Sequence, residues 1–330
     1  MKNIVIIGGG TGTFTLLSGL RKFPVNNTVI ISSADDGGST GRLRTELSVM
    51  PAGDIRQCLV GLSYTDEALK KLFNYRFDKG SLSGHTVGNI LLAALEKITG
   101  NVESAIAASA KLLNVRGEVL PVTLFPTKLS ARLKNGNTIV GEHRIDEPTA
   151  KHRSPIVGLS LSPSAPANPR ALDAIRHADA IVFGPGDLFS STLPSLLVRG
   201  VKEAILKSSA KKVFIVNIMT KSGQTDGFSA SDFVQTFNSY LSQDKKTFVV
   251  DAVIVNTKKP GAADLVRYRK TGATLVQTDA ANLRKFGARV IAAPLVSSRS
   301  FKRANGDTLT RSFLRHDENK IAKIIWEIVS

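Results

Sequence analysis

The stretch that most constrains the fold is the beginning of the chain, which reads NIVIIGGGTGTFTLLSGL from Asn3. A short apolar run leads into a group of glycines, and Leu16, Leu17 and Leu20 then recur at helical spacing. This order predicts a buried strand, a tight loop and a helix. Thr28–Ser32 reads TVIIS and predicts a second strand soon after that helix. Such a start favours a sheet of parallel strands whose faces are covered by helices.

Strand-like and helix-like patterns continue along the rest of the chain. Residues 54–112 have a largely helical pattern, and 116–162 carry strand-like stretches with a hairpin turn at Asn135–Asn137. A proline-rich connector follows at 162–170, after which short apolar runs such as DAIVFG and KVFIVNIM alternate with amphipathic segments. We therefore expect one α/β domain over residues 1–330, with a Rossmann-like, doubly wound, mostly parallel sheet and a β-rich insertion at about 116–162.

Composition bears on the compartment and on the class of protein. The hydrophobic fraction of 42% and the charged fraction of 22% are ordinary for a globular chain, and no apolar run approaches the roughly 18 residues of a membrane span. The single cysteine, Cys58, excludes an intramolecular disulfide and is typical of a reducing compartment. The first residues lack the pattern of a secretory signal, so we expect a cytoplasmic protein.

The chain is strongly basic, with 44 Lys and Arg residues against 27 Asp and Glu residues and a net charge of +17. Such a balance predicts an anionic partner: nucleic acid, a membrane surface or a phosphorylated small molecule. The basic residues are scattered, and only 6% of residues are aromatic, which disfavours a nucleic-acid-binding module. A phosphorylated small molecule is therefore the favoured ligand, with nucleic acid as the weaker alternative.

The glycine loop GGGTGT offers free backbone amides at the positive end of a helix dipole, which suits a phosphate or pyrophosphate. The loop departs from the dinucleotide fingerprint because Thr13 stands where the third glycine is expected, and it lacks the P-loop lysine. A tight turn that binds no ligand is the competing explanation. The candidate ligand-binding residues of this loop are Gly9, Gly10, Thr11, Gly12 and Thr13.

A second loop of unusual content follows the second strand and reads SADDGGSTGRLR from Ser33. Ligands of doubly wound sheets bind outside the carboxyl ends of the strands, where this loop is expected. Its glycines allow close approach, its hydroxyls and arginines suit an anion, and its aspartates suit either sugar hydroxyls or Mg²⁺. A turn that caps the next helix is the plainer alternative. The candidates are Asp35, Asp36, Gly37, Gly38, Ser39, Thr40 and Arg42.

Three further helix starts carry candidate residues. Asp54 follows Pro-Ala-Gly, so it either caps a helix or belongs to a site. His85 precedes a helix whose expected N-cap is Thr86 and is either structural or a ligand contact, and Asn89 follows in the first turn. The stretch FGPGDLF repeats the pattern of strand, glycine loop and helix. Its candidates are Gly184, Pro185 and Gly186.

Other chemistry has no clear signal in the sequence. There is no clustered His and Cys spacing for a metal, no G-x-S-x-G motif, and no pair that stands out as general acid and general base. The residues therefore indicate electrostatic handling of phosphates and leave open whether the site turns over.

Taken together and in order, these motifs resemble the YvcK family of bacterial proteins, called gluconeogenesis factors, which is related to CofD, the 2-phospho-L-lactate transferase of deazaflavin-cofactor synthesis. The matching stretches span nearly the whole chain: IGGGTGT, ADDGGSTGRLR, PAGDIRQCL, YRF, GHTVGN, FGPGDLFSSTLPSLLV, VNIMTKSGQTD and RHD at Arg315–Asp317.

The chain departs from the family pattern at a few positions. Ala52 stands where a proline is more common, and Asp187 and Phe189 stand in place of Ser and Tyr. Lys221–Gln224 reads KSGQ in place of Gln-Pro-Gly-Glu. Asp187 brings a carboxylate to an expected anion loop, and Lys221 is a candidate to compensate for it.

The resemblance implies a Rossmann-like core that binds a nucleotide-diphosphate ligand. YvcK proteins are linked to UDP-sugar binding, carbon metabolism and cell shape, whereas CofD transfers a phospholactyl group from a nucleotide-linked donor with Mg²⁺. The residues carried over by motif are Gly10, Thr11 and Gly12 for phosphates, Asp36 and Asp54 for a metal or ligand hydroxyls, and His85, Asn89 and Gly184–Gly186 for the remaining pocket.

We therefore expect a cytoplasmic, homo-oligomeric regulatory protein that binds a UDP-sugar or an NAD(P)-like ligand. The alternative is a Mg²⁺-dependent transferase of the CofD type, with Asp36 and Asp54 as the metal ligands.

Overall fold

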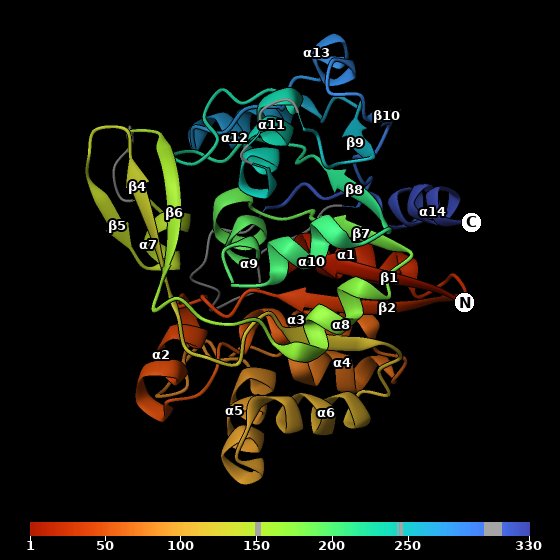
Figure 1. Cartoon of the computed structure of the whole chain (residues 1–330). Helices are drawn as coiled ribbons and strands as arrows, with labels where there is room; N and C mark the ends of the chain where they lie inside the picture. The colour runs from red at the N-terminus through yellow and green to blue at the C-terminus, as the bar shows by residue number, and fades with distance from the viewer. Residues whose placement is uncertain (149–152, 243, 245–246, 300–311) are drawn as a thin grey trace.

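A seven-stranded sheet forms the centre of the computed structural model, which describes residues 1–148, 153–242, 244, 247–299 and 312–330. The strand order is β10-β9-β8-β7-β1-β2-β3, and all pairings between these neighbours are parallel (Figure 1). The strands are β1 Lys2–Ile7, β2 Val25–Ile31, β3 Glu118–Pro121, β7 Ala180–Phe183, β8 Lys211–Ile215, β9 Ala252–Asn256 and β10 Arg289–Ala293. The predicted doubly wound α/β fold is confirmed.

The central strands are buried on both faces, which explains why they read as continuous apolar runs. In β1, Ile4 and Ile6 belong to the core on one face of the sheet, and Val5 and Ile7 belong to the core on the other. Helices α1, α3 and α14 pack on the first face, and α8, α10 and α11 pack on the second.

The described helices are α1 Gly10–Leu20, α2 Gly38–Leu47, α3 Gly53–Leu62, α4 Glu67–Asn74, α5 Val87–Thr99, α6 Val102–Leu112, α7 Glu142–Asp146, α8 Pro169–Arg176, α9 Leu193–Leu196, α10 Val201–Lys207, α11 Ala230–Leu241, α12 Ala262–Lys270, α13 Ala280–Arg284 and α14 Glu318–Val329. A π-helical turn, Leu188–Thr192, precedes α9. Within the described ranges, none of these helices has the length and apolar character needed to cross a bilayer.

The point where the strand order reverses lies between β1 and β7. The chain runs from β1 to β2 and β3 on one side and then returns to β7 on the other. The loops after β1 and β7 therefore leave the same edge of the sheet side by side, and such a crevice is the usual ligand position in doubly wound folds.

The middle of the chain forms a small antiparallel sheet, as predicted, in the order β5-β4-β6. Its strands are β4 Lys128–Leu133, β5 Thr138–Val140 and β6 Ile156–Ser162, with α7 between β5 and β6. The first strand of the predicted 116–162 stretch behaves differently, because β3 pairs with β2 and forms the edge of the main sheet. The insertion thus begins after β3, and its apolar face, which includes Leu129 and Ile145, joins the main core.

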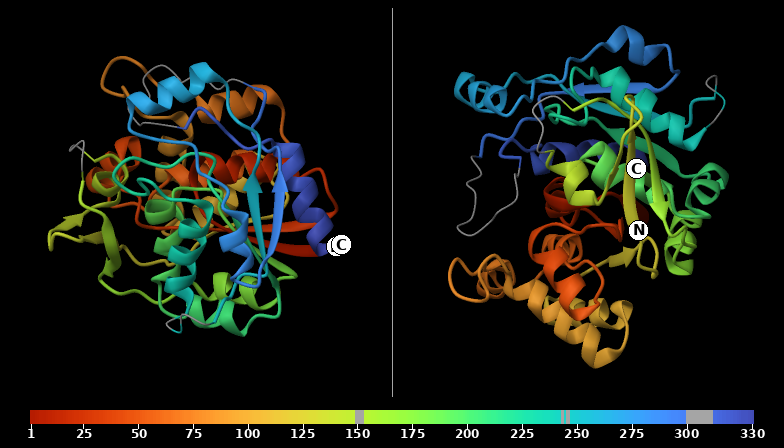
Figure 2. Two further views of the ribbon diagram at one scale, coloured as in Figure 1. Left: turned by 90° about the horizontal axis from the view of Figure 1, so that it is seen from above. Right: turned by 90° about the vertical axis from the view of Figure 1, so that its left-hand side faces the viewer.

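Helix α14 closes the structure by packing on α1. Gly19 makes this possible, because a Cβ added there would lie 2.0 Å from the backbone carbonyl oxygen of Glu318. The two ends of the chain lie close together in every view (Figures 1 and 2). Helix α14 is amphipathic and buries Ile321, Ala322, Ile325 and Val329.

Candidate functional site

The two glycine loops that the sequence singles out meet at the carboxyl edge of the sheet. A Cβ added at Gly12 would lie 2.2 Å from the carbonyl oxygen of Pro185, and one added at Gly186 would lie 3.5 Å from the carbonyl oxygen of Gly9. Backbone therefore runs against backbone at the β1–β7 crevice. The approach requires glycine at Gly12, whereas the 3.5 Å at Gly186 is an ordinary contact distance for a Cβ.

The helices that begin at this edge do so without side-chain caps. Helices α1, α2 and α3 have Gly9, Gly37 and Ala52 as N-caps, and none of the three receives a side-chain hydrogen bond. Three helices that follow them in the chain are capped by side chains, namely α4 by Asp66, α5 by Thr86 and α6 by Asn101. The first amides of α1, α2 and α3 thus keep their capacity to bind an anion.

Asp54 lies against the first glycine loop and does not cap α3. That helix begins at Gly53 after the N-cap Ala52, which places Asp54 within its first turn. A Cβ added at Gly9 would lie 1.9 Å from Oδ2 of Asp54. Of the two readings that the sequence allows, the structure excludes the N-cap and places the carboxylate beside the presumed phosphate loop.

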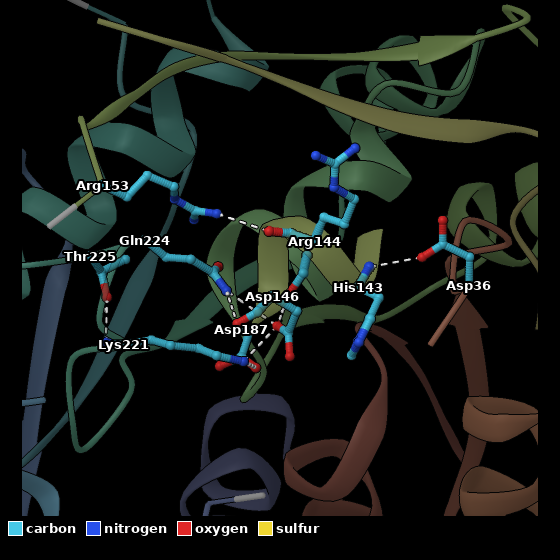
Figure 3. Close-up of polar contacts among 10 residues, drawn as sticks. Asp36, His143, Arg144, Asp146, Arg153, Asp187, Lys221, Gln224 and Thr225 are labelled. Carbon is cyan, nitrogen blue, oxygen red and sulfur yellow. Dashed lines mark hydrogen bonds and ion pairs between the residues drawn. The ribbon is translucent and has the colours of Figure 1, made fainter. Parts of the chain in front are cut away.

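Asp35 and Asp36 face different neighbours although they are adjacent in sequence. The Gly37 amide donates to Oδ1 of Asp35 at 2.9 Å, and the other oxygen of this carboxylate lies near Gly53 at the start of α3. Burial raises the pKa of Asp35. The amide of His143 donates to Oδ1 of Asp36 at 2.8 Å, so Asp36 faces α7 of the insertion (Figure 3).

Three predicted ligand residues form a buried hydrogen-bonded group. Ser39 Oγ lies 2.9 Å from Nδ1 of His85, and Asn89 donates to Ser39 Oγ at 3.2 Å. Arg56 Nε donates to Asn89 at 3.0 Å, and burial lowers the pKa of His85. The group ties the first turn of α2 to the start of α5. Their contact with a ligand remains a prediction, whereas their contact with one another is a property of the fold.

The remaining predicted side chains are also engaged within the protein. Thr11 donates to Gln57 at 3.3 Å, and Thr13 donates to the carbonyl oxygen of Gly9 at 3.2 Å. Arg42 is exposed and donates to the carbonyl oxygen of Ser83 at 2.5 Å. The backbone of the loops, more than these side chains, is thus left for a ligand.

A cluster around Lys221 forms the other half of this edge (Figure 3). Lys221 Nζ lies 2.5 Å from Oδ1 of Asp146 on α7 and 2.6 Å from Oδ2 of Asp187 in the loop after β7. Ser190 and Gln224 also donate to Oδ1 of Asp146, at 2.6 and 3.2 Å. The compensation of Asp187 by Lys221 that the sequence suggests is therefore present as an ion pair.

One positive charge in this cluster serves two carboxylates, and the pKa values reflect it. Burial alone would lower the pKa of Lys221, but Asp187 and Asp146 raise it above its usual range. Against the effect of burial, Lys221 lowers the pKa of Asp146. Burial and the neighbouring Asp146 keep the pKa of Asp187 raised. Lys221 therefore stays charged and holds the insertion against the loops after β7 and β8.

The insertion was missed as part of the site. Helix α7 contacts the loop after β2 through Asp36 and the loops after β7 and β8 through Asp146. Arg153, just beyond α7 in the chain, donates to the carbonyl oxygen of Arg144 at 3.1 Å (Figure 3). It also donates to the carbonyl oxygen of Gly223 at 2.7 Å. The one available sequence signal was the spacing of Glu142 and Asp146, which places two acids on one helix face.

A metal at this edge would need the ligand to complete its coordination. In the part of the chain that the structure describes, no group of three or more His, Cys, Asp or Glu side chains could hold a metal ion. Mg²⁺ commonly takes one or two carboxylates together with phosphate oxygens, and Asp54 beside the glycine loop suits that role. Asp36 as the second ligand stays a prediction, with one of its oxygens bound to the His143 amide.

Comparison with known proteins decides the family. The model of the 2-phospho-L-lactate transferase CofD family matches residues 4–296. The chain belongs to the CofD family. It is 40% identical over 327 residues to the gluconeogenesis factor of Halalkalibacterium halodurans, covering 99% of this chain and 96% of that protein. It is 38% identical over 328 residues to the gluconeogenesis factor of Bacillus subtilis, covering 99% and 98%.

The fold of this CofD family member also has a solved counterpart. A crystal structure of a UPF0052 family protein from Bacillus halodurans superposes with a TM-score of 0.89 at 39% identity and covers 98% of both chains. The resemblance to the gluconeogenesis factors and CofD is thus confirmed in sequence and in fold.

Proposed function

We propose that this CofD-type protein binds a nucleotide-diphosphate ligand, a UDP-sugar or a dinucleotide, at the carboxyl edge of its sheet. The observation that supports the proposal best is the meeting of the loops Gly8–Gly12 and Gly184–Gly186 at the β1–β7 crevice. The uncapped start of α1 lies at the same place, and backbone amides at a helix start are suited to a pyrophosphate.

In this proposal each half of the edge has a separate task. The amides of α1 hold the phosphates, and the carboxylate of Asp54 accepts ligand hydroxyls or shares a Mg²⁺ ion with the phosphates. The Lys221 cluster holds the insertion across the crevice and limits access of water. The relatives are named gluconeogenesis factors, which supports a role of this binding in carbon metabolism, and the resemblance to YvcK proteins extends the proposal to cell shape.

A Mg²⁺-dependent transferase is the second candidate, because the family model that matches is that of a transferase and Asp54 lies at the glycine loop. Bound Mg²⁺ would supply neutralisation of phosphate charge. The chain itself would hold the donor phosphates on the amides of α1 and align the acceptor beneath α7.

Isothermal titration with UDP-N-acetylglucosamine, UDP-glucose, NAD⁺ and NADP⁺ tests the binding proposal. We expect saturable binding of at least one of these compounds, and an absence of binding by all four would overturn the proposal. Release of a nucleotide from the bound compound in the presence of Mg²⁺, lost in Asp54→Asn, would instead favour the transferase.

A further inference from the structure

The small antiparallel sheet projects from one side of the molecule, and β5 is its outermost strand (Figure 1). This strand, Thr138–Val140, pairs with β4 along one side only. Thr138 is exposed, and Val140 is 46% exposed. The other side of β5 is therefore an open sheet edge within the part of the chain that the structure describes.

The hydrogen bonds to β4 determine which backbone groups of β5 point outward. In an antiparallel pair, successive residues of a strand direct their N–H and C=O groups alternately toward the partner strand and away from it. The Gly141 amide donates to the carbonyl oxygen of Leu129 at 2.8 Å, so Gly141 points toward β4, as does Ile139. Thr138 and Val140 thus direct their backbone groups away from β4. Among the described residues, no hydrogen bond involves these outward groups.

This open edge lacks the features by which edge strands avoid pairing with another chain. Charged side chains are a common device of this kind. In the main sheet, the edge strand β3 carries Glu118, and the edge strand β10 begins with the exposed Arg289. The other edge strand of the small sheet, β6, lies next to the body of the molecule, and its Leu159 and Leu161 pack against the main core (Figure 1). Residues 135–141 read NGNTIVG and contain neither a charge nor a proline. The edge formed by β5 is thus the one best suited to pairing.

A second copy of β5 matches this edge in one register. When two such strands run antiparallel about a two-fold axis at Ile139, Thr138 of each strand lies opposite Val140 of the other. Every outward N–H group of one strand then meets an outward carbonyl oxygen of its partner, and the β-branched side chains pair on one face. Arg132, opposite Thr138 on β4, lies with its guanidinium beside Gly158 of β6, so it leaves this contact uncharged.

The shortness of β5 favours a second copy over an extended peptide as the occupant. Peptides that add a strand to a sheet gain specificity from pockets for their alternate side chains. β5 has three residues, of which Thr138 and Val140 present outward backbone groups. Two-fold pairing makes each contact twice and needs no feature beyond the edge itself.

We propose that two copies of the chain associate through β5 in this register and join their small sheets into one continuous antiparallel sheet. The inference goes beyond the proposed function and needs no ligand. The contact is small, so we expect a weak dimer with a dissociation constant of about 10–100 µM. Each copy has a net charge of +17, so association should strengthen as salt screens the repulsion.

Sedimentation equilibrium of the full chain over about 5–500 µM, a range that spans the expected constant, tests the proposal. We expect the wild type to change from monomer to dimer in this range. Val140→Lys should weaken association about 10-fold or more, because it places a charge on the edge. The matched control is Val157→Lys on β6, where a valine of the same sheet with 48% exposure receives the same charge. The control is expected to associate like the wild type, and urea unfolding shows that both variants fold.

The proposal is overturned if the wild type stays monomeric at the highest concentration in both low and high salt. Equal weakening in Val140→Lys and Val157→Lys would also overturn it, because that result shows an effect of net charge alone. Unchanged association in a folded Val140→Lys would place the interface elsewhere and have the same consequence.

Cysteine substitutions test the register. In the proposed pairing, Ile139 faces its own copy in a pair without hydrogen bonds, with Cα atoms about 4.5 Å apart, which suits a disulfide. The two Val140 residues are offset along the strands and lie more than about 7 Å apart, beyond the reach of a disulfide. We expect Ile139→Cys to form a covalent dimer under mild oxidation and the more exposed Val140→Cys to form far less. The native Cys58 is buried and does not compete. Equal cross-linking of the two variants, or none in Ile139→Cys, would contradict the proposed register.

Discussion

The two halves of the carboxyl edge hold charge in different ways. The half formed by α1, α2 and α3 is built from backbone: glycines in close contact and uncapped amides. The half formed by α7 and the loops after β7 and β8 is built from side chains, with Lys221 between Asp146 and Asp187. Backbone dipoles do not titrate and cannot be removed singly, whereas an ion pair depends on each partner.

The largest effect is expected from removing the charge that holds the side-chain half. Lys221→Met leaves Asp146 and Asp187 without their cation. Breaking a fully buried pair costs about 3–5 kcal/mol of unfolding free energy, and because these side chains are partly exposed we expect a loss of about 3 kcal/mol, at the lower end of that range. Urea unfolding of the two proteins measures it. The control is Lys2→Met, since Lys2 pairs with Asp179 at 3.5 Å on the surface and should cost less than about 1 kcal/mol. If Lys221→Met cost as little stability as Lys2→Met, the two halves of the edge would not differ in their dependence on an ion pair.

A buried histidine beside the carboxyl end of β8 makes the stability of the protein depend on pH, which backbone amides cannot do. Burial lowers the pKa of His316, which hydrogen-bonds the backbone of Val216 at the end of β8, to about 4 from 6.5. Between these values the unfolded chain binds a proton that the folded chain does not, so stability falls as pH drops from about 6.5 towards 4, by about 2–3 kcal/mol in total.

The measurement is the urea-unfolding free energy of the wild type and His316→Gln at about pH 7.5 and pH 4.5. Because other groups titrate equally in both proteins, the difference between their pH dependences isolates His316. The loss on acidification should be smaller in the variant. Parallel loss in both proteins would show that His316 titrates normally.

The smallest effect on stability is expected in the backbone half, where two alanine substitutions sharpen the contrast. Gly12→Ala directs a Cβ at the rigid carbonyl of Pro185 and should cost about 1–3 kcal/mol, against the helix preference for alanine. Gly9→Ala meets only the end of the Asp54 side chain, which can move, and should cost less than about 1 kcal/mol.

Gly9→Ala is expected to affect ligand binding more than stability. Gly9→Ala displaces Asp54 and fills the loop, so it should weaken the UDP-sugar or dinucleotide identified by titration about 10-fold although the fold is kept. Unchanged binding in a stable Gly9→Ala variant would argue against a ligand in this loop.

The sequence predicted the features of the fold that depend on short stretches of chain. Apolar runs and glycine positions predicted the strands, the helix starts and the two loops that meet, because these follow from backbone geometry over a few residues. The position of β3 was misjudged, since a short strand at the end of a helical region carries no mark of its partner β2. The fold class needed only the alternation of elements.

The side-chain half was harder to predict because it is assembled from distant segments. The contact between Asp146 and Lys221 depends on the packing of the small sheet on the main core, and no local pattern specifies that packing. The type of a hydrogen-bonding residue also does not show whether its partner is a ligand or another side chain. Ser39, His85 and Asn89 were expected to contact a ligand, and in the structure they hydrogen-bond one another.

The contact between Gly19 and Glu318 has a consequence for how the protein is made. The face of α1 that α14 covers includes part of the main core, yet α14 follows almost the entire chain in sequence. During synthesis from the amino end, the first strand–helix unit must keep apolar surface uncovered until α14 has left the ribosome. A prematurely terminated chain would carry the complete glycine loop on an unfinished core, marked for chaperones and proteases by the surface it exposes.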